Sequence, residues 1–408
     1  MNPALHPRAW ATLFLPFALG YYLSYLLRTV NAVISPDLTQ ELTLSASDLG
    51  LLTSGYFLTF GLAQIPLGIA LDRYGPRRIN AMLLLVAGFG AVVFALGESM
   101  LELTLGRGLI GLGVSACLMA GLKAFSMWYP AERQSSMTGF IMAAGALGAL
   151  TAATPIEAVL PAIGWRGVFW TLAVVAVVAA SYVWLCIPDT PTADETGSLR
   201  EAVGSLGQIF RSLDFLRFAG TAMFFTGGFM ALQSLWAVPW LMTVEELSRS
   251  QAAGYLVLLN LGMFCGQMSI GFFGTRLAKR GVRPVNLLQT GYCCVLAVEV
   301  LIITGALPSA PLWFLLGLLA AVNAQAYVAA ASCFPRAAFG RVSTAINLMA
   351  FAGAFVVQWG MGIVLDVLGA AGHTGTIALT TAFAMLIAVQ SIVIVPLFWR
   401  RGRNAQTN

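Results

Sequence analysis

Five polar side chains recur at helical spacing along an apolar stretch near the start of the chain. Tyr21, Tyr25, Arg28, Asn31 and Ser35 follow one another at intervals of three or four residues. This spacing places them on one face of an α-helix. The Arg28 guanidinium is a planar fork of N–H donors that suits a carboxylate or phosphate, and it stays charged in a low-dielectric site. The stripe therefore predicts a binding site for a small anion.

An arginine in such a stretch can also play either of two structural roles. It can pair with a buried acid, or its long side chain can reach the lipid headgroups. A charge at the centre of a membrane helix costs about 2.5–3.5 kcal/mol on insertion scales, and it usually marks a pathway for substrate or ions. The stretch around Arg28 contains no obvious acidic partner, which favours the anion site.

The composition requires a membrane around this helix. Apolar residues make up 59% of the 408 residues, and charged residues make up 10%, whereas soluble domains carry about 25% charged residues. Twelve apolar segments are each long enough to cross the hydrocarbon layer. The expected fold is therefore an all-α membrane protein with twelve transmembrane helices near residues 10–35, 47–71, 79–97, 101–126, 135–160, 166–187, 216–243, 251–275, 285–306, 310–334, 342–367 and 376–398.

Most of the 22 basic residues fall in loops on one side of these segments. The positive-inside rule then places both termini in the cytoplasm, with the chain in a bacterial inner membrane. The same loops account for the net charge of +5 without a nucleic-acid partner. The six cysteines and two histidines show no metal or redox spacing, and no nucleophile–base arrangement is visible. We therefore expect no metal, no cofactor and no enzyme activity.

A short basic turn occurs twice, at roughly half-chain distance. Residues 68–78 read Gly-Ile-Ala-Leu-Asp-Arg-Tyr-Gly-Pro-Arg-Arg, and a degraded copy follows roughly 206 positions later at residues 274–284. Internal duplication is typical of transporters. We expect an N-terminal six-helix bundle over residues 1–187, a cytoplasmic linker with an amphipathic helix over 188–215, a C-terminal six-helix bundle over 216–400 and a tail over 401–408.

The first turn resembles the signature Gly-x-x-x-Asp-Arg-x-Gly-x-Arg-Arg of the major facilitator superfamily, and residues 128–133 (Trp-Tyr-Pro-Ala-Glu-Arg) are a second match. The resemblance covers essentially the whole chain. It implies two pseudo-symmetric six-helix bundles that expose a central cavity to one membrane face at a time. It also implies gating roles for Asp72, Arg73, Arg77 and Arg133, although the turn could serve only as a topological anchor. Because Ala278 stands where a second Asp would be, the latch is expected to be one-sided.

Further polar groups within the spans complete the predicted site. Lys123 is a second cation, with headgroup contact as its alternative role. Uncharged groups in other spans could each serve only as helix–helix contacts, but together they suit a small, partly apolar anion. The substrate-binding prediction comprises Arg28, Tyr21, Tyr25, Asn31, Tyr56, Lys123, Gln233, Trp236, Asn260, Asn323, Tyr327, Asn347 and Gln358.

Deep carboxylates are scarce. Glu157 in span five and Glu299 in span nine could each hold a proton, because burial disfavours the charged form of a carboxyl group. Arg107 precedes several glycines in a pattern that partly resembles the antiporter branches of the family. We interpret this glycine pattern as helix packing through small residues.

The combination of Arg28 with the Pro76-Arg77-Arg78 turn loosely resembles the organic-anion symporter branch of the family. The leading prediction is a monomeric secondary transporter for a small carboxylate-like anion, driven by protons. The alternative is a proton-coupled efflux antiporter for a drug or metabolite, which predicts an essential Glu157 or Glu299. Arg28 in place of an acid, and Ala146 in place of a proline, argue against efflux. A transport-incompetent receptor on the same scaffold is a third possibility.

Overall fold

The computed structural model describes residues 10–189, 199–335 and 338–399, and within these ranges the chain forms helices and turns without a strand. The first half contains the π-turn η2 (Trp10–Phe14) and the helices α1 (Leu15–Leu42), α2 (Ala46–Leu96), α3 (Met100–Val114), α4 (Cys117–Trp128), α5 (Ala131–Thr151) and α6 (Thr154–Cys186).

The second half is more often interrupted by local π- and 3₁₀-turns. After α7 (Leu199–Phe210) it contains α8 (Leu213–Thr221), η3 (Ala222–Thr226), α9 (Gly227–Ala231), η4 (Leu232–Trp236), α10 (Ala237–Thr243), α11 (Arg249–Lys279), α12 (Pro284–Thr304), α13 (Ser309–Ala320), η5 (Ala321–Asn323), α14 (Ala324–Ala331), α15 (Phe339–Ala370), α16 (Gly375–Val393) and α17 (Val395–Phe398). Elements α8 to α10 form one continuous span, and α13 to α14 form another.

These elements make twelve membrane crossings. Ten helical segments in the described ranges are long and apolar enough to span a bilayer. One of them, α2, contains a non-helical residue at Gly75 and therefore provides two crossings. Helix α3 packs on both arms of α2, with Gly111 against Tyr56 and Gly113 against Ala87. The shorter apolar helix over Ser136–Thr151 is the twelfth crossing. The predicted all-α fold with twelve spans is confirmed.

Gly75 and Gly281 have nearly the same φ angle in the two repeated basic turns. Their φ angles are 78° and 80°, a left-handed region that glycine adopts without the steric cost of a Cβ atom. Gly75 separates the two arms of α2, and Gly281 separates α11 from α12. The sequence repeat thus builds the same reversal in each half.

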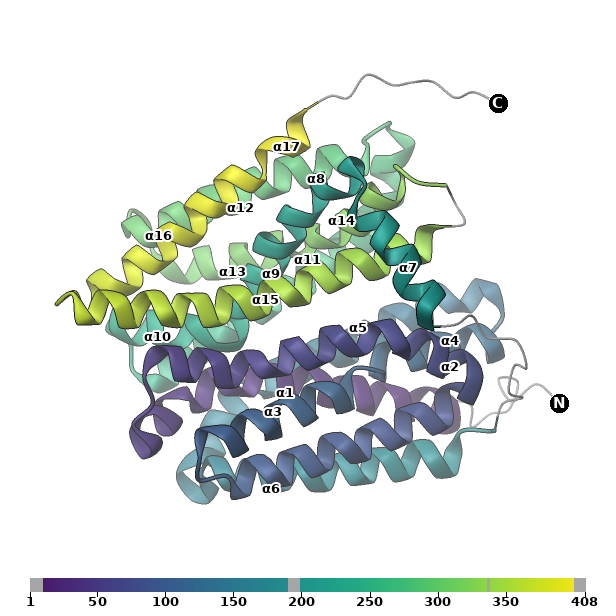
Figure 1. Ribbon diagram of the computed structural model, residues 1–408, viewed down its shortest axis with the longest axis horizontal. Helices are drawn as coiled ribbons and strands as arrows, with labels where there is room; N and C mark the ends of the chain where they lie inside the picture. Colours follow the sequence, from purple (N-terminus) through teal and green to yellow (C-terminus); the bar gives the residue numbers. More distant parts are fainter. Residues whose placement is uncertain (1–9, 190–198, 336–337, 400–408) are drawn as a thin grey trace.

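The two halves lie side by side, with α7 at one end of the boundary between them (Figure 1). Both ends of the described chain lie on this side. Tyr182 near the end of α6 donates to the carbonyl of Ala11 (2.6 Å), and Arg217 near the start of α8 donates to the carbonyl of Trp399 (2.8 Å). We call this the linker side, and the opposite end of the helices the far side.

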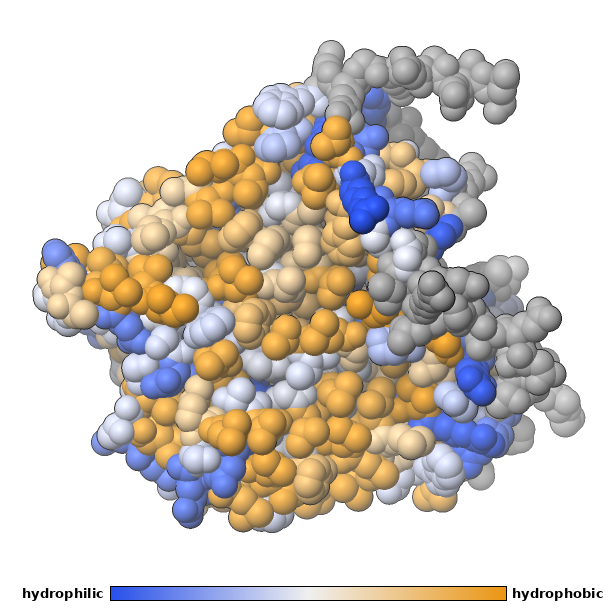
Figure 2. All heavy atoms as spheres, in the orientation of Figure 1, coloured by the Kyte–Doolittle hydropathy of each residue, from blue (hydrophilic) through white to orange (hydrophobic). Residues whose placement is uncertain are grey.

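Large apolar side chains cover the outer surface of the bundle. Leu62, Phe89, Val174 and Leu185 are among those more than half exposed. Figure 2 shows hydrophobic residues across the middle of one face and hydrophilic residues gathered toward its ends. A surface of this kind is solvated by lipid rather than by water. The protein is a multi-pass integral membrane protein.

The end of span five differs from the sequence expectation. The sequence predicts that this span runs to residue 160, but α5 ends at Thr151 and α6 begins at Thr154, with Pro155 in its first turn. Proline fits the first turn of a helix because the N–H that it lacks has no partner there. Glu157 therefore lies in the first turns of α6, before a kink at Gly164, and it is half-buried.

Candidate functional site

Arg28 lies at the centre of the molecule, as the fourteenth of the 28 residues of α1. Its side chain is 5% exposed. Four aromatic rings surround its guanidinium carbon, with centroids at 4.5 Å (Tyr25), 6.0 Å (Tyr56), 5.4 Å (Phe60) and 5.6 Å (Phe351). Three of these rings belong to the first half, and Phe351 belongs to α15 of the second. The cation therefore lies at the boundary between the halves.

No carboxylate balances this charge within the described residues. None of the ion pairs found there includes Arg28, and its Nε atom has no hydrogen-bond partner. The aromatic faces attract a cation but do not neutralise it. A buried charge without a counter-ion is costly, so the site favours an anion from outside the chain.

Two neighbours of Arg28 on the same helix also have unused polar atoms. Asn31 is fully buried, and both atoms of its side-chain amide have no hydrogen-bond partner. The hydroxyl oxygen of Ser24 is likewise buried and unpartnered. Buried polar groups are nearly always hydrogen-bonded. The helix that carries the predicted stripe thus offers donors and acceptors near the guanidinium that the protein itself does not use.

Tyr21 and Tyr25 form the part of the site that faces α5. Their rings are 5.2 Å apart in an edge-to-face arrangement, and the hydroxyl of Tyr21 contacts the sulfur of Met142 at 3.7 Å. Gly145 makes room for the pair, because a Cβ atom there would lie 2.7 Å from Tyr21 Cε1 and 3.0 Å from Tyr25 Cδ2.

Tyr327 and Asn347 approach from the second half. The Tyr327 hydroxyl donates to Asn347 Oδ1 at 2.9 Å, which joins α14 to α15. Tyr327 also interacts electrostatically with Tyr25 and Arg28. The structure therefore brings Arg28, Tyr25, Tyr56 and Tyr327, which come from three different predicted spans, into one neighbourhood.

Four other residues predicted to bind substrate use their polar atoms within the protein. Gln233 Nε2 donates to Asn260 Oδ1 (2.6 Å), and Asn260 Nδ2 donates to the Ala149 carbonyl (3.2 Å). Gln358 Nε2 donates to Thr53, its side-chain oxygen accepts from Ser234 (3.1 Å), and its carbonyl accepts from the Trp236 indole (3.0 Å). The Asn260–Ala149 and Gln358–Thr53 bonds cross between the halves, so in this conformation these groups hold the halves together.

Two further contacts between the halves lie on the far side. Asp366 of α15 accepts hydrogen bonds from the backbone amides of Ala46 (3.0 Å) and Ser47 (2.9 Å) at the start of α2. Arg249 at the start of α11 forms an ion pair with Asp37 and donates to the Val33 carbonyl (2.8 Å). The far side is therefore closed by polar contacts between the two halves.

Lys123, on α4, lies apart from Arg28, against the basic turn on the linker side. Its ammonium donates to the Leu71 carbonyl at 2.8 Å and forms an ion pair with Asp72. The arginines of the basic turn make other contacts: Arg77 donates to the Trp184 carbonyl (2.9 Å) and stacks on its ring, and Arg73 stacks on Tyr74. Arg133 is exposed.

Glu299 and Asn323 lie together inside the second half. Glu299 is 7% exposed, and Gln390 donates to it at 3.3 Å. Asn323 lines the same small cavity as Glu299. No hydrogen bond described here links either residue to the group of aromatic rings around Arg28.

The sequence analysis interpreted Arg107 as part of a helix-packing segment and left it out of the predicted binding residues, but the structure places it beside the site as a second buried arginine. Arg107 on α3 is 1% exposed, donates to the Leu27 carbonyl at 2.9 Å and lies 5.3 Å from the centroid of Tyr56. It belongs to none of the ion pairs in the described residues. The signal was present, since Arg107 is a charge within an apolar segment. Phe60 and Phe351, stacked at 4.3 Å, gave no such signal.

The fold and this central cation define a class of protein: an integral membrane protein of two six-helix halves that enclose a buried polar site at their boundary. The family model of the Major Facilitator Superfamily matches residues 17–358. The chain belongs to this superfamily.

Single members of the superfamily match parts of this chain at low sequence identity. The probable L-galactonate transporter of Escherichia coli K12 is 26% identical over 65% of this chain and 61% of its own length. The hexuronate transporter of the same organism is 30% identical over 41% of this chain and 37% of its own length. The matches thus span less than two thirds of each relative. The solved structure of a mutant of the nucleoside transporter NupG has a TM-score of 0.76 at 12% identity and covers 94% of this chain and 98% of that one.

Proposed function

We propose that the protein is a secondary transporter for a small organic anion, with Arg28 as the group that binds the carboxylate. The observation that carries this proposal is a buried arginine at mid-span that has no acidic partner among the described residues. The relatives named for galactonate and hexuronate transport support the same chemistry, since both substrates are sugar acids.

The surroundings of Arg28 suit such a ligand. Its planar fork matches a carboxylate in a bidentate manner. Asn31 and Ser24 supply unused polar atoms for the hydroxyl groups of a sugar acid. The rings of Tyr25, Phe60 and Phe351 provide apolar faces against which a carbon skeleton can pack.

The contacts between halves support alternating access as the mechanism. The far-side contacts of Asp366 and Arg249 must break if the site is to open there. We propose that the linker side is cytoplasmic, that the membrane is a bacterial inner membrane, and that protons drive transport. Glu299 and Glu157 are the proposed proton carriers. Gating by Asp72, Arg73, Arg77 and Arg133 is part of the same proposal.

Uptake by purified protein in liposomes tests the substrate and the driving ion. Labelled galacturonate and L-galactonate should accumulate when the outside is more acidic than the inside. The variant Arg28→Ala should lose at least about tenfold in uptake, because hydrogen bonds to charged groups contribute about 1.5–3 kcal/mol. Arg28→Lys keeps the charge without the fork and should retain an intermediate rate.

Arg211→Ala is the matched control, because Arg211 is exposed between α7 and α8. It should transport like the wild type. If Arg28→Ala also transports like the wild type, the anion proposal is wrong. Transport of lipophilic cations against the proton gradient, without uptake of sugar acids, would support the efflux alternative instead.

A further inference from the structure

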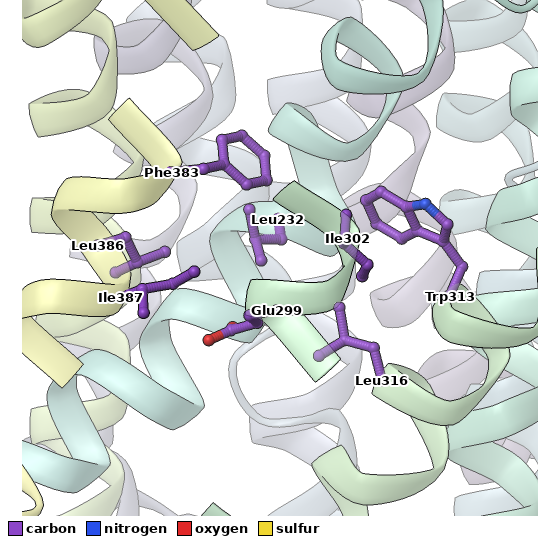
Figure 3. A pocket seen from close by; sticks show the side chains of 8 residues that line it. All are labelled: Leu232, Glu299, Ile302, Trp313, Leu316, Phe383, Leu386 and Ile387. Atoms are coloured by element: carbon purple, nitrogen blue, oxygen red, sulfur yellow. The ribbon is translucent and has the colours of Figure 1, made fainter. Parts of the chain in front are cut away.

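Glu299 is an isolated acid in the interior of the second half. It projects from α12, and its Oε1 atom accepts a hydrogen bond from Gln390 Nε2 of α16 at 3.3 Å. The same Gln390 nitrogen donates to the Phe224 carbonyl of η3 at 3.2 Å, which fixes the orientation of the amide. Figure 3 shows the carboxyl group among Leu232, Leu386 and Ile387.

The unsatisfied side-chain atoms of Glu299, Gln390 and Asn323 are all acceptor oxygens. Glu299 Oε2, Gln390 Oε1 and Asn323 Oδ1 are buried and have no hydrogen-bond partner. Asn323 reaches the cluster from η5, where it lines a cavity together with Glu299, Phe225 and Phe229. Three acceptors without a donor indicate that a hydrogen-bond donor or a cation is missing from this cluster.

The described residues around Glu299 do not supply a cation. The residues lining the two cavities beside Glu299 include no other charged side chain. Tyr292, two turns earlier on α12, is a nearby titratable group. Its ring stacks on Phe225 with a centroid distance of 4.0 Å, and its hydroxyl is buried without a hydrogen-bond partner. An ionised carboxylate in such surroundings is strongly unfavourable unless a counter-ion accompanies it.

We propose that Glu299, Gln390 and Asn323 form a binding site for one monovalent cation, either a proton or a sodium ion. Each cavity beside Glu299 has a volume of about 10 Å³, which is about the room that one water molecule needs. A proton on Oε2 would let the carboxylic acid donate to Gln390 while Gln390 donates back. A sodium ion would instead accept all three oxygens as ligands. Calcium is excluded because it takes about 6–8 oxygen ligands and usually several carboxylates.

This site gives the proposed proton coupling a specific cation-binding site. The inference rests on the proposed function only for the role of this site in transport. Binding of the cation can be measured without the sugar-acid substrate, and the proposed ligands do not include Arg28. The test therefore measures binding without substrate, so that this inference and the proposed function can fail separately.

Two measurements on substrate-free protein in lipid nanodiscs distinguish a proton from a sodium ion as the ligand. If sodium is the ligand, replacing choline chloride by sodium chloride at constant ionic strength should raise the Tm of the wild type and leave that of Glu299→Gln unchanged. If a proton is the ligand, infrared spectroscopy at neutral pH should show a protonated carboxyl band that Glu299→Gln lacks. In that case Gln390→Leu should shift the band, because the acid loses its acceptor.

Glu299→Gln is expected to fold, since its amide reproduces both hydrogen bonds of the neutral acid with Gln390. Should it not fold, the sodium titration and the infrared pH titration of the wild type decide the question by themselves. The control Glu98→Gln removes an exposed carboxylate and should keep the wild-type response in both measurements. A wild type with neither a sodium response nor a protonated carboxyl band would overturn the proposal.

Discussion

Asp366 and Ala46 join the two halves through the end of a helix. The Asp366 carboxylate, on α15, accepts hydrogen bonds from the first backbone amides of α2 at Ala46 and Ser47. The first amides of a helix lack partners within the helix, and they lie at the positive end of its dipole. An acid of one half therefore caps a helix of the other. In the proposed alternating-access cycle, this cap would have to break before the far side could open.

We expect Asp366→Ala to shift the protein toward states that are open on the far side. Loss of an N-terminal cap costs about 1 kcal/mol, which changes the equilibrium between closed and open states about fivefold. The measurement is the labelling rate of a cysteine introduced at Thr39, which lines the far-side cavity between the halves, in a cysteine-free background.

Asp48→Asn is the matched control for Asp366→Ala. Asp48 lies in the same first turn of α2 but completes a capping box with Ser45 inside the first half. Its loss should lower stability without raising the labelling rate at Thr39. Equal labelling in both variants would contradict the role of Asp366 as a contact between halves.

Gly145→Ala should weaken substrate binding while the protein remains folded. The added methyl group would lie 2.7 Å from the Tyr21 ring and 3.0 Å from the Tyr25 ring, so the pair must leave its present position beside Arg28. We expect a Kd about five- to tenfold higher, equivalent to about 1–1.4 kcal/mol. Gly139→Ala on the same helix meets no atom within 4 Å and should bind like the wild type. A normal Kd for Gly145→Ala would remove the tyrosine pair from the site.

Lys123→Gln should slow transport and leave substrate affinity within about twofold of the wild type. The reason is that Lys123 pairs with Asp72 on the linker side and does not lie beside Arg28. Asp72→Asn should have the same effect, since either change removes one ion pair. The pair is partly exposed and contributes at most about 1 kcal/mol. Binding and uptake measured separately give the answer, and a large loss of affinity in Lys123→Gln alone would restore its predicted role as a substrate ligand.

Gly75→Ala should lower thermal stability. Alanine at φ 78° and ψ 160° costs about 1–3 kcal/mol, because essentially only glycine adopts this backbone region. Gly68→Ala, a few residues earlier in the same motif, meets no atom within 4 Å in the folded protein and should be neutral or slightly stabilising. A Tm of Gly75→Ala equal to that of Gly68→Ala would show that the reversal does not depend on glycine.

The sequence predicted the fold well because lipid imposes a simple pattern on it. Each crossing needs an apolar stretch of sufficient length, and the repeat of the basic turn was visible in Gly75 and Gly281. The predicted end of span five was wrong because Pro155, which falls within the apolar stretch, in fact begins the next helix.

The site was predicted less completely, for reasons that concern contacts between distant segments. The stripe around Arg28 was visible because its residues share one helix. The sequence did not show that Phe351 would complete the set of four aromatic rings around Arg28, because one phenylalanine in an apolar span resembles any other. Nor does the sequence reveal whether an amide such as Gln358 binds a ligand or another helix. That depends on which groups face it across the boundary between halves.

The origin of the four rings around Arg28 determines what a rocking motion can change. Tyr25, Tyr56 and Phe60 would travel with the arginine as one rigid body, and only Phe351 would separate from it. A bound ligand would thus move together with the first bundle during the proposed transport cycle. The affinity for the ligand on the two sides of the membrane would differ mainly by the contacts that α14 and α15 make with it. A small difference would let the protein release the ligand on either membrane face.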